Sequence, residues 1–118
     1  MIKNSKLQNL FKLSSKVTVI VPSTININEE IDNTIYVDRV ASLMSDLFGG
    51  ATATTTLGYW KSPTAGLVKE KSTTVFAYCS ENDLQSGIDK VIDLCTELKD
   101  ELKQDAIALE INGEMYFI

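Results

Sequence analysis

The side chains best suited to chemistry lie on either side of a predicted turn at residues 62–66. They are Tyr59 and Trp60 before the turn and Glu70 and Ser72 after it. On a strand, Glu70 and Ser72 point to the same face because they are two residues apart. A carboxylate beside a hydroxyl can orient a ligand or act as a general base. The pair can equally form a local hydrogen bond that fixes the hairpin, with Trp60 covering the edge of the core, so no catalytic residue is assigned.

A second candidate site is acidic. Residues 1–16 hold four of the 11 basic residues and none of the 16 acidic ones, so the rest of the chain is more acidic than the net charge of −5 indicates. Such a charge repels nucleic acid and favours basic partners. Carboxylates are dense on a predicted helix over residues 81–105, which is either a solvated face or a surface that binds a basic protein. The predicted partner-binding residues are Asp93, Glu97, Asp100 and Glu101.

The composition limits the chemistry further. A chain of 118 residues with 44% hydrophobic and 23% charged residues is typical of one globular domain, and its apolar runs are too short to span a bilayer. The absence of histidine excludes any mechanism that needs an imidazole. Two cysteines give neither a disulfide framework nor a zinc spacing. We therefore expect no metal, no cofactor and no membrane contact.

Residues 1–16 form a basic leader that precedes the predicted domain at residues 17–118. The leader carries Lys3, Lys6, Lys12 and Lys16, and it places Leu7, Leu10 and Phe11 on one side if it is helical. It is interpreted either as a frayed terminus or as a short amphipathic arm. It lacks the apolar stretch and the cleavage site of a signal peptide, so a cytoplasmic location is expected.

The hydrophobic pattern predicts the elements that position these residues. Strands are expected at residues 17–21, 51–60 and 67–79, and a helix at residues 33–48 that Asp32 or Asn33 caps and Gly49-Gly50 ends. Ser80 and Asp83 resemble a capping box that opens the helix over residues 81–105. Its apolar stripe includes Cys95, which is interpreted as a small buried hydrophobe. Residues 107–111 and 114–118 flank Asn112-Gly113, a strong hairpin signal.

This order predicts an α+β fold with ferredoxin-like topology. The elements run β-α-β-β-α-β, with an added C-terminal hairpin strand, in one antiparallel sheet backed by two helices on one face. The opposite face is left without helices. Residues 51–56 are threonines and alanines, whose small side chains allow a second sheet to approach closely. We therefore expect a homodimer through the open sheet face.

The residues around the hairpin resemble those of an uncharacterised family of small bacterial domains. Gly58-Tyr59-Trp60 and the later Gly66, Val68, Glu70 and Ser72 match its G-x-W … G-x-[IV]-x-E-x-S core. The segment from Gln104 to Ile107 is similar to the Gln-x-x-Val that begins the closing strand of that family. The resemblance covers residues 33–110 and implies a fold, but no activity.

Two function classes follow from these features. The first is a small, acidic, non-enzymatic domain that binds a protein, an inhibitor of the kind that phages and other mobile elements direct against host defence. The alternative is a cofactor-independent enzyme or small-ligand module of the dimeric α/β-barrel type, with Tyr59, Trp60, Glu70 and Ser72 at its site. RNA binding by the sheet is not expected, because the body is acidic and the basic glycine-aromatic signature of such sheets is missing.

Overall fold

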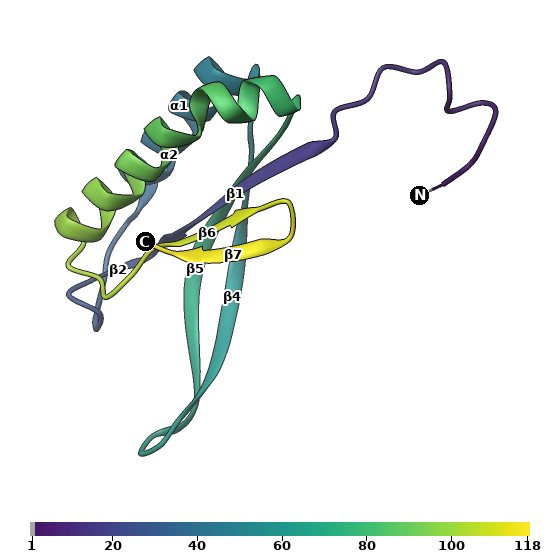
Figure 1. Ribbon diagram of the computed structural model, residues 1–118. Helices are drawn as coiled ribbons and strands as arrows, with labels where there is room; N and C mark the ends of the chain where they lie inside the picture. Colours follow the sequence, from purple (N-terminus) through teal and green to yellow (C-terminus); the bar gives the residue numbers. More distant parts are fainter. Residues whose placement is uncertain (1) are drawn as a thin grey trace.

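The computed structural model describes residues 2–118 as a sheet layer and a helix layer, with two projecting segments (Figure 1). The elements are β1 (Ser15–Pro22), β2 (Thr24–Ile25), β3 (Glu29–Glu30), α1 (Thr34–Phe48), β4 (Thr52–Ser62), β5 (Gly66–Cys79), α2 (Glu81–Glu101), β6 (Ala108–Ile111) and β7 (Glu114–Phe117). The predicted mixed α+β class is confirmed, as are both helices and the antiparallel sheet.

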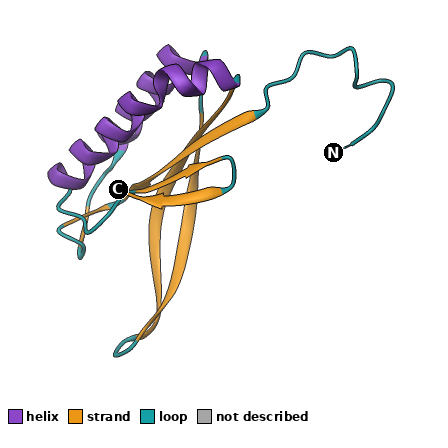
Figure 2. Cartoon of the chain, viewed as in Figure 1, coloured by secondary structure: helices purple, strands orange, loops and turns teal. Residues whose placement is uncertain are grey.

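The main sheet has five strands in the order β4-β5-β1-β6-β7, and each neighbouring pair is antiparallel (Figure 2). β2 and β3 form a separate two-stranded ladder. At the predicted hairpin turn, Asn112 and Gly113 both have positive φ, which a tight two-residue turn between twisted strands requires.

Both helices cover one face of the sheet and form the core with it. Alternate residues of β1 (Val17, Val19 and Val21) are fully buried, as the period of two in a strand requires. They pack with Val75 and Ala77 of β5 against the apolar stripes of the helices. The most buried helical residues include Val40, Met44, Val91, Cys95 and Leu98.

The helix termini differ in part from the prediction. Ser80 accepts a hydrogen bond from the Asp83 amide at 3.1 Å, and Gly49 ends α1 at a φ of 91°, both as expected. Of the two residues predicted to cap α1, Asp32 makes the bond: its carboxylate accepts from the Thr34 amide at 3.0 Å, whereas the Asn33 side chain makes no cap. α2 ends at Glu101 and not at residue 105, because Lys103 adopts a left-handed φ of 51° and turns the chain.

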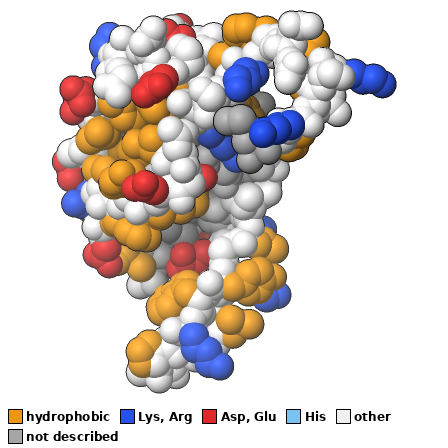
Figure 3. Space-filling view, turned by 45° about the vertical axis from the view of Figure 1, so that its right-hand side comes forward, with side chains coloured by type: hydrophobic (Ala, Val, Ile, Leu, Met, Phe, Trp, Pro, Cys, Tyr) orange, Lys and Arg blue, Asp and Glu red, His pale blue; other side chains and the backbone are white. Residues whose placement is uncertain are grey.

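Two segments project from the body (Figure 1). The β4–β5 hairpin is paired continuously from Thr52↔Phe76 to Ser62↔Gly66, and most of its side chains are exposed. Residues 2–14 precede the sheet and form turns, with no helix among them. Figure 3 shows apolar side chains exposed over the hairpin and lysines along the leader. Both segments carry exposed apolar side chains, whereas the rest of the chain is packed in two layers.

Candidate ligand-binding site

The face of the sheet without helices carries the carboxylate singled out from the sequence. In the register of β4 and β5, Glu70 lies opposite Gly58, and Ser72 lies opposite Thr56. Directly opposed residues share a face, so all four are on the side away from the helices. Gly58 has no side chain, and a Cβ built there would approach only the Glu70 carbonyl, at 3.8 Å. The glycine therefore leaves space beside the Glu70 carboxylate.

Trp60 and Glu70 interact directly. The indole Nε1 of Trp60 donates a hydrogen bond to Oε1 of Glu70 at 3.1 Å, across one diagonal of the β4–β5 ladder. Trp60 remains 48% exposed, so it does not cover the edge of the core as one interpretation of the sequence suggested. Within the described part of the chain, Oε2 of Glu70 makes no hydrogen bond. The exposed indole ring of Trp60 therefore lies beside a carboxylate oxygen, Oε2 of Glu70, that can accept a hydrogen bond from a ligand.

Ser72 belongs to a neighbouring group of hydroxyls. Its Oγ lies 2.8 Å from Oγ1 of Thr56, which in turn lies 3.0 Å from Oγ1 of Thr74. Glu70 and Ser72 share a face as predicted, but the hydrogen bond suggested between them is not formed, because each has found a partner on β4. Ser72 therefore contributes a polar wall and does not activate the carboxylate.

Gln104 reaches the same region from a distant part of the chain. It follows the left-handed Lys103, and its Nε2 donates to the carbonyl oxygens of Thr24 at 3.0 Å and Leu102 at 3.2 Å. These bonds tie the connection between α2 and β6 to β2. Sequence reasoning noticed Gln104 only as part of a family motif. The sequence placed Gln104 inside the predicted helix over residues 81–105, so no local signal marked its contact with Thr24.

These residues surround a hollow of about 490 Å³ on the helix-free side of the hairpin. A second hollow, of about 690 Å³, lies along the hairpin and adjoins the start of α1. Thr24, Ile27, Glu70 and Lys71 line both hollows, so Glu70 stands at the junction. The first hollow is also lined by Ile20, Pro22, Trp60, Ser72, Gln104 and Asp105. Apolar walls with a few convergent polar groups are typical of small-molecule sites.

Tyr59 is the one member of the predicted ligand set that lies elsewhere. Adjacent residues of a strand point to opposite faces, so Tyr59 faces away from Trp60 and Glu70. Its ring is 55% exposed, and the ammonium group of Lys69 lies 6.0 Å from the ring centre. Within one copy of the chain, the structure brings Trp60, Glu70 and Ser72 to the hollow but not Tyr59.

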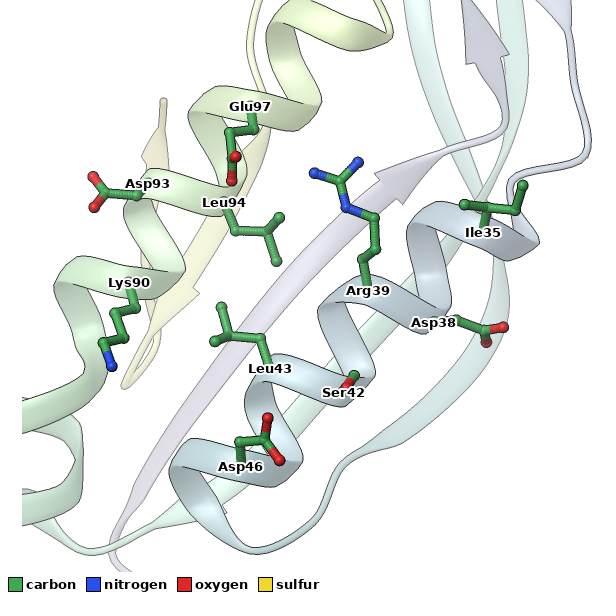
Figure 4. A pocket seen from close by; sticks show the side chains of 10 residues that line it. All are labelled: Ile35, Asp38, Arg39, Ser42, Leu43, Asp46, Lys90, Asp93, Leu94 and Glu97. Atoms are coloured by element: carbon green, nitrogen blue, oxygen red, sulfur yellow. The ribbon is translucent and has the colours of Figure 1, made fainter.

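The predicted partner-binding carboxylates follow one side of α2. Glu101 is already engaged, because its carboxylate accepts from Nη1 of Arg39 at 2.9 Å, the only ion pair among residues 2–118. Asp93 and Glu97 line a groove between α1 and α2 (Figure 4). Asp100 is exposed. A basic partner would therefore meet three available carboxylates.

Neither cysteine is suited to nucleophilic chemistry. Cys79 and Cys95 are both buried as free thiols, and burial raises the pKa of Cys95 to about 12. Burial also raises the pKa of Cys79, with a smaller contribution from the carboxylate of Asp83. Since the thiolate is the reactive form, both side chains act as small hydrophobes.

Two other kinds of site are missing from residues 2–118. No cluster of three or more acidic, cysteine or histidine side chains in this range could hold a metal ion. No helix in the same range is long and apolar enough to cross a membrane.

Comparison with known proteins gives matches by structure alone. No family model matches the chain, and no curated protein matches it by sequence. The backbone is similar to that of a phage SAM lyase in complex with S-methyl-5'-thioadenosine, with a TM-score of 0.64 and 19% identity over 95% of this chain and 94% of that one. A phage SAM lyase in its apo state matches with a TM-score of 0.62 and 20% identity, over 93% of this chain and 95% of that one. CutA1, a divalent ion tolerance protein from Ehrlichia chaffeensis, gives 0.50 and 10% identity over 85% and 79%.

These similarities concern the fold. They offer no support for the predicted role as an inhibitor of host defence, and they do not bear on the bacterial family that the hairpin motif resembles. Both remain predictions, as does the cytoplasmic location.

Proposed function

We propose that this chain is a cofactor-independent enzyme that cleaves S-adenosylmethionine and releases S-methyl-5'-thioadenosine. The protein whose backbone it matches is named a SAM lyase, and its structure is a complex with S-methyl-5'-thioadenosine. The observation that carries the proposal is the hollow at Trp60, Glu70 and Gln104, in a backbone that matches the lyase over nearly the whole of both chains. The strand order β4-β5-β1-β6 supports the ferredoxin-like topology predicted from the sequence.

The chemistry of the substrate suits a chain without histidine. S-adenosylmethionine carries a sulfonium centre, and its product is the neutral thioether. Breaking the bond from sulfur to the aminobutyrate chain gives the electron pair to sulfur. The carbon that is left can accept an electron pair from the substrate's own carboxylate by ring closure. The reaction therefore needs no imidazole and no second substrate.

The side chains at the hollow match three parts of such a ligand. The exposed face of Trp60 can stack on a flat adenine ring or lie against the cationic sulfonium. Oε2 of Glu70 can accept from the ammonium or ribose hydroxyl groups. The side-chain carbonyl of Gln104, whose Nε2 is held by Thr24 and Leu102, is a further acceptor. As the substrate's ring closes, the positive charge on the sulfonium and the negative charge on the carboxylate are both lost. Apolar walls such as Ile20, Pro22 and Ile27 therefore favour the transition state.

A test of the proposal is direct. The purified protein is incubated with S-adenosylmethionine, and S-methyl-5'-thioadenosine is measured by chromatography. We expect E70Q to lower kcat/KM by about 10- to 100-fold, the range of a lost hydrogen bond to a charged group. The matched control is D89N, which removes an exposed carboxylate on α2 outside both hollows. A folded wild-type protein that forms no S-methyl-5'-thioadenosine would refute the proposal.

We propose separately that copies of this chain associate through the helix-free face. Thr52, Thr54 and Thr56 of β4 share that face with Ser72 and Thr74, and these small side chains allow a second sheet to approach. Nearby, the hydroxyl of Thr18 is buried without a hydrogen-bond partner in the part of the chain that the structure describes. The sequence predicts a dimer, and light scattering at several concentrations measures the number of copies. A monomer at every concentration would contradict self-association without affecting the lyase proposal.

A further inference from the structure

β1 begins at Ser15, so the leader proper is residues 2–14 of the described chain, and it exposes apolar side chains that nothing in its own chain covers. Phe11 is 87% exposed, Ile2 79% and Leu10 61%. Lys3 and Lys6 lie between Ile2 and Leu10 in the sequence, and Lys12 directly follows Phe11. A basic segment with large exposed hydrophobic residues is typical of a peptide segment that binds an acidic, apolar surface.

The groove between α1 and α2 is such a surface. It has a volume of about 700 Å³ and lies on the outer side of the helix layer. Leu43 and Leu94 point toward each other across it and form its apolar floor (Figure 4). Four carboxylates line it, two from each helix: Asp38, Asp46, Asp93 and Glu97.

The charge balance of the groove is negative. Two cationic side chains also line it, Arg39 and Lys90. Arg39 is paired with Glu101, which lies outside the groove, so its charge is already compensated. Lys90 is left against four carboxylates. The groove therefore has the apolar floor and the excess negative charge that match the leader.

The leader of the same chain is directed away from this groove. Leu13 lies beside a small hollow formed by the end of α1 and by Phe76 and Tyr78 of β5. The ammonium group of Lys16 lies 4.9 Å from the centre of the Phe76 ring, on the helix-free face. From there the chain extends away from both helices (Figure 1). Its own groove lies on the opposite side of the sheet.

We propose that the leader of one copy binds in the α1–α2 groove of a second copy. Leu10 and Phe11 lie on the apolar floor at Leu43 and Leu94, and the lysines face the carboxylates of the rim. This contact is separate from the helix-free face, so it joins copies through the opposite layer of the molecule.

Site-directed crosslinking tests the exchange of leaders. One variant carries L10C and another carries S42C at the groove. Cys79 and Cys95 are buried, so the introduced thiols are the accessible ones. Mixing the two variants under mild oxidation should give a disulfide-linked heterodimer of twice the chain mass. When T96C, on a side of α2 outside the groove, replaces S42C, the yield of crosslinked heterodimer should be at least 10-fold lower.

Two results would overturn the proposal. One is a mixture that gives no more crosslinked dimer with S42C than with T96C. The other is a crosslink that forms only within single chains carrying both L10C and S42C, which would mean that each leader folds back onto its own groove.

Charge exchange supplies an independent readout. The K6E/K12E leader should crosslink at least 10-fold less to S42C than the unchanged leader does. Combining that leader with a partner that carries D93K/E97K should restore most of the yield, because attraction returns with reversed signs. Yields that do not depend on these charges would contradict the electrostatic match.

Discussion

The two faces of the sheet differ in what holds them together. The helix-covered face is fixed by apolar packing, with Val17, Val19 and Val75 almost completely buried beneath the helices. The helix-free face is organised by hydrogen bonds between side chains, exposed in the case of Trp60 with Glu70 and partly buried in the case of Thr56 with Ser72. Packing therefore supplies the stability, while polar groups on the other face remain available for a ligand. The following substitutions test this division, from the largest expected effect to the smallest.

A core substitution should have the largest effect. Leu98 of α2 has no exposed surface, so L98A should lower the free energy of unfolding by about 2–5 kcal/mol. Leu57 of the hairpin is 53% exposed, and L57A should change the free energy of unfolding by less than about 0.5 kcal/mol. Urea denaturation followed by circular dichroism measures both. Similar values for the two variants would contradict the division.

The W60F variant should separate function from stability. It removes the hydrogen bond to Glu70 and leaves an aromatic ring, so we expect kcat/KM for S-adenosylmethionine to fall by about 3- to 10-fold. The midpoint of thermal unfolding should stay within about 2 °C, because Trp60 is half-exposed. A large loss of stability with unchanged turnover would assign Trp60 to the fold and not to the site.

The cap of α2 gives an effect of intermediate size on stability alone. Ser80 accepts a hydrogen bond from the Asp83 amide, so S80A should lower the free energy of unfolding by about 1 kcal/mol. S80D keeps an acceptor at the same place and should recover most of that loss. If S80A unfolds at the same free energy as the wild type, the cap contributes nothing.

The smallest effect is expected at the ion pair on the helix layer. Arg39 and Glu101 are both partly exposed, so R39A should lower the free energy of unfolding by about 0.2–1 kcal/mol, and less at high salt. Denaturation at two salt concentrations is the measurement. A loss above 2 kcal/mol that persists in salt would mean that this pair belongs to the core.

Local signals in the sequence predicted most of the fold. The buried strand at residues 17–21, the cap at Ser80, the left-handed Gly49 and the turn at Asn112-Gly113 each depend on neighbouring residues, and each is found. The end of α2 was misplaced. Only the left-handed φ of Lys103 terminates that helix, and lysine carries no signal for such a conformation.

The candidate site was predicted less completely, because its geometry depends on contacts between distant segments. Glu70 and Ser72 were correctly placed on one face from their spacing. The register that sets Trp60 beside Glu70, and Tyr59 on the other side, is fixed only by the pairing of β4 with β5. Gln104 contacts Thr24 across 80 positions of the chain, which no local pattern predicts. Asn33 likewise donates to Pro22 and Thr73 in place of capping a helix.

The most direct measurement is the reaction itself. Purified wild-type protein, E70Q and D89N are each incubated with S-adenosylmethionine, and S-methyl-5'-thioadenosine is measured over time. The account predicts steady release by the wild type and by D89N, and a rate about 10- to 100-fold lower with folded E70Q. Release that is absent from all three, or equal in all three, would contradict the assignment of the hollow at Trp60 and Glu70 as a site that cleaves S-adenosylmethionine.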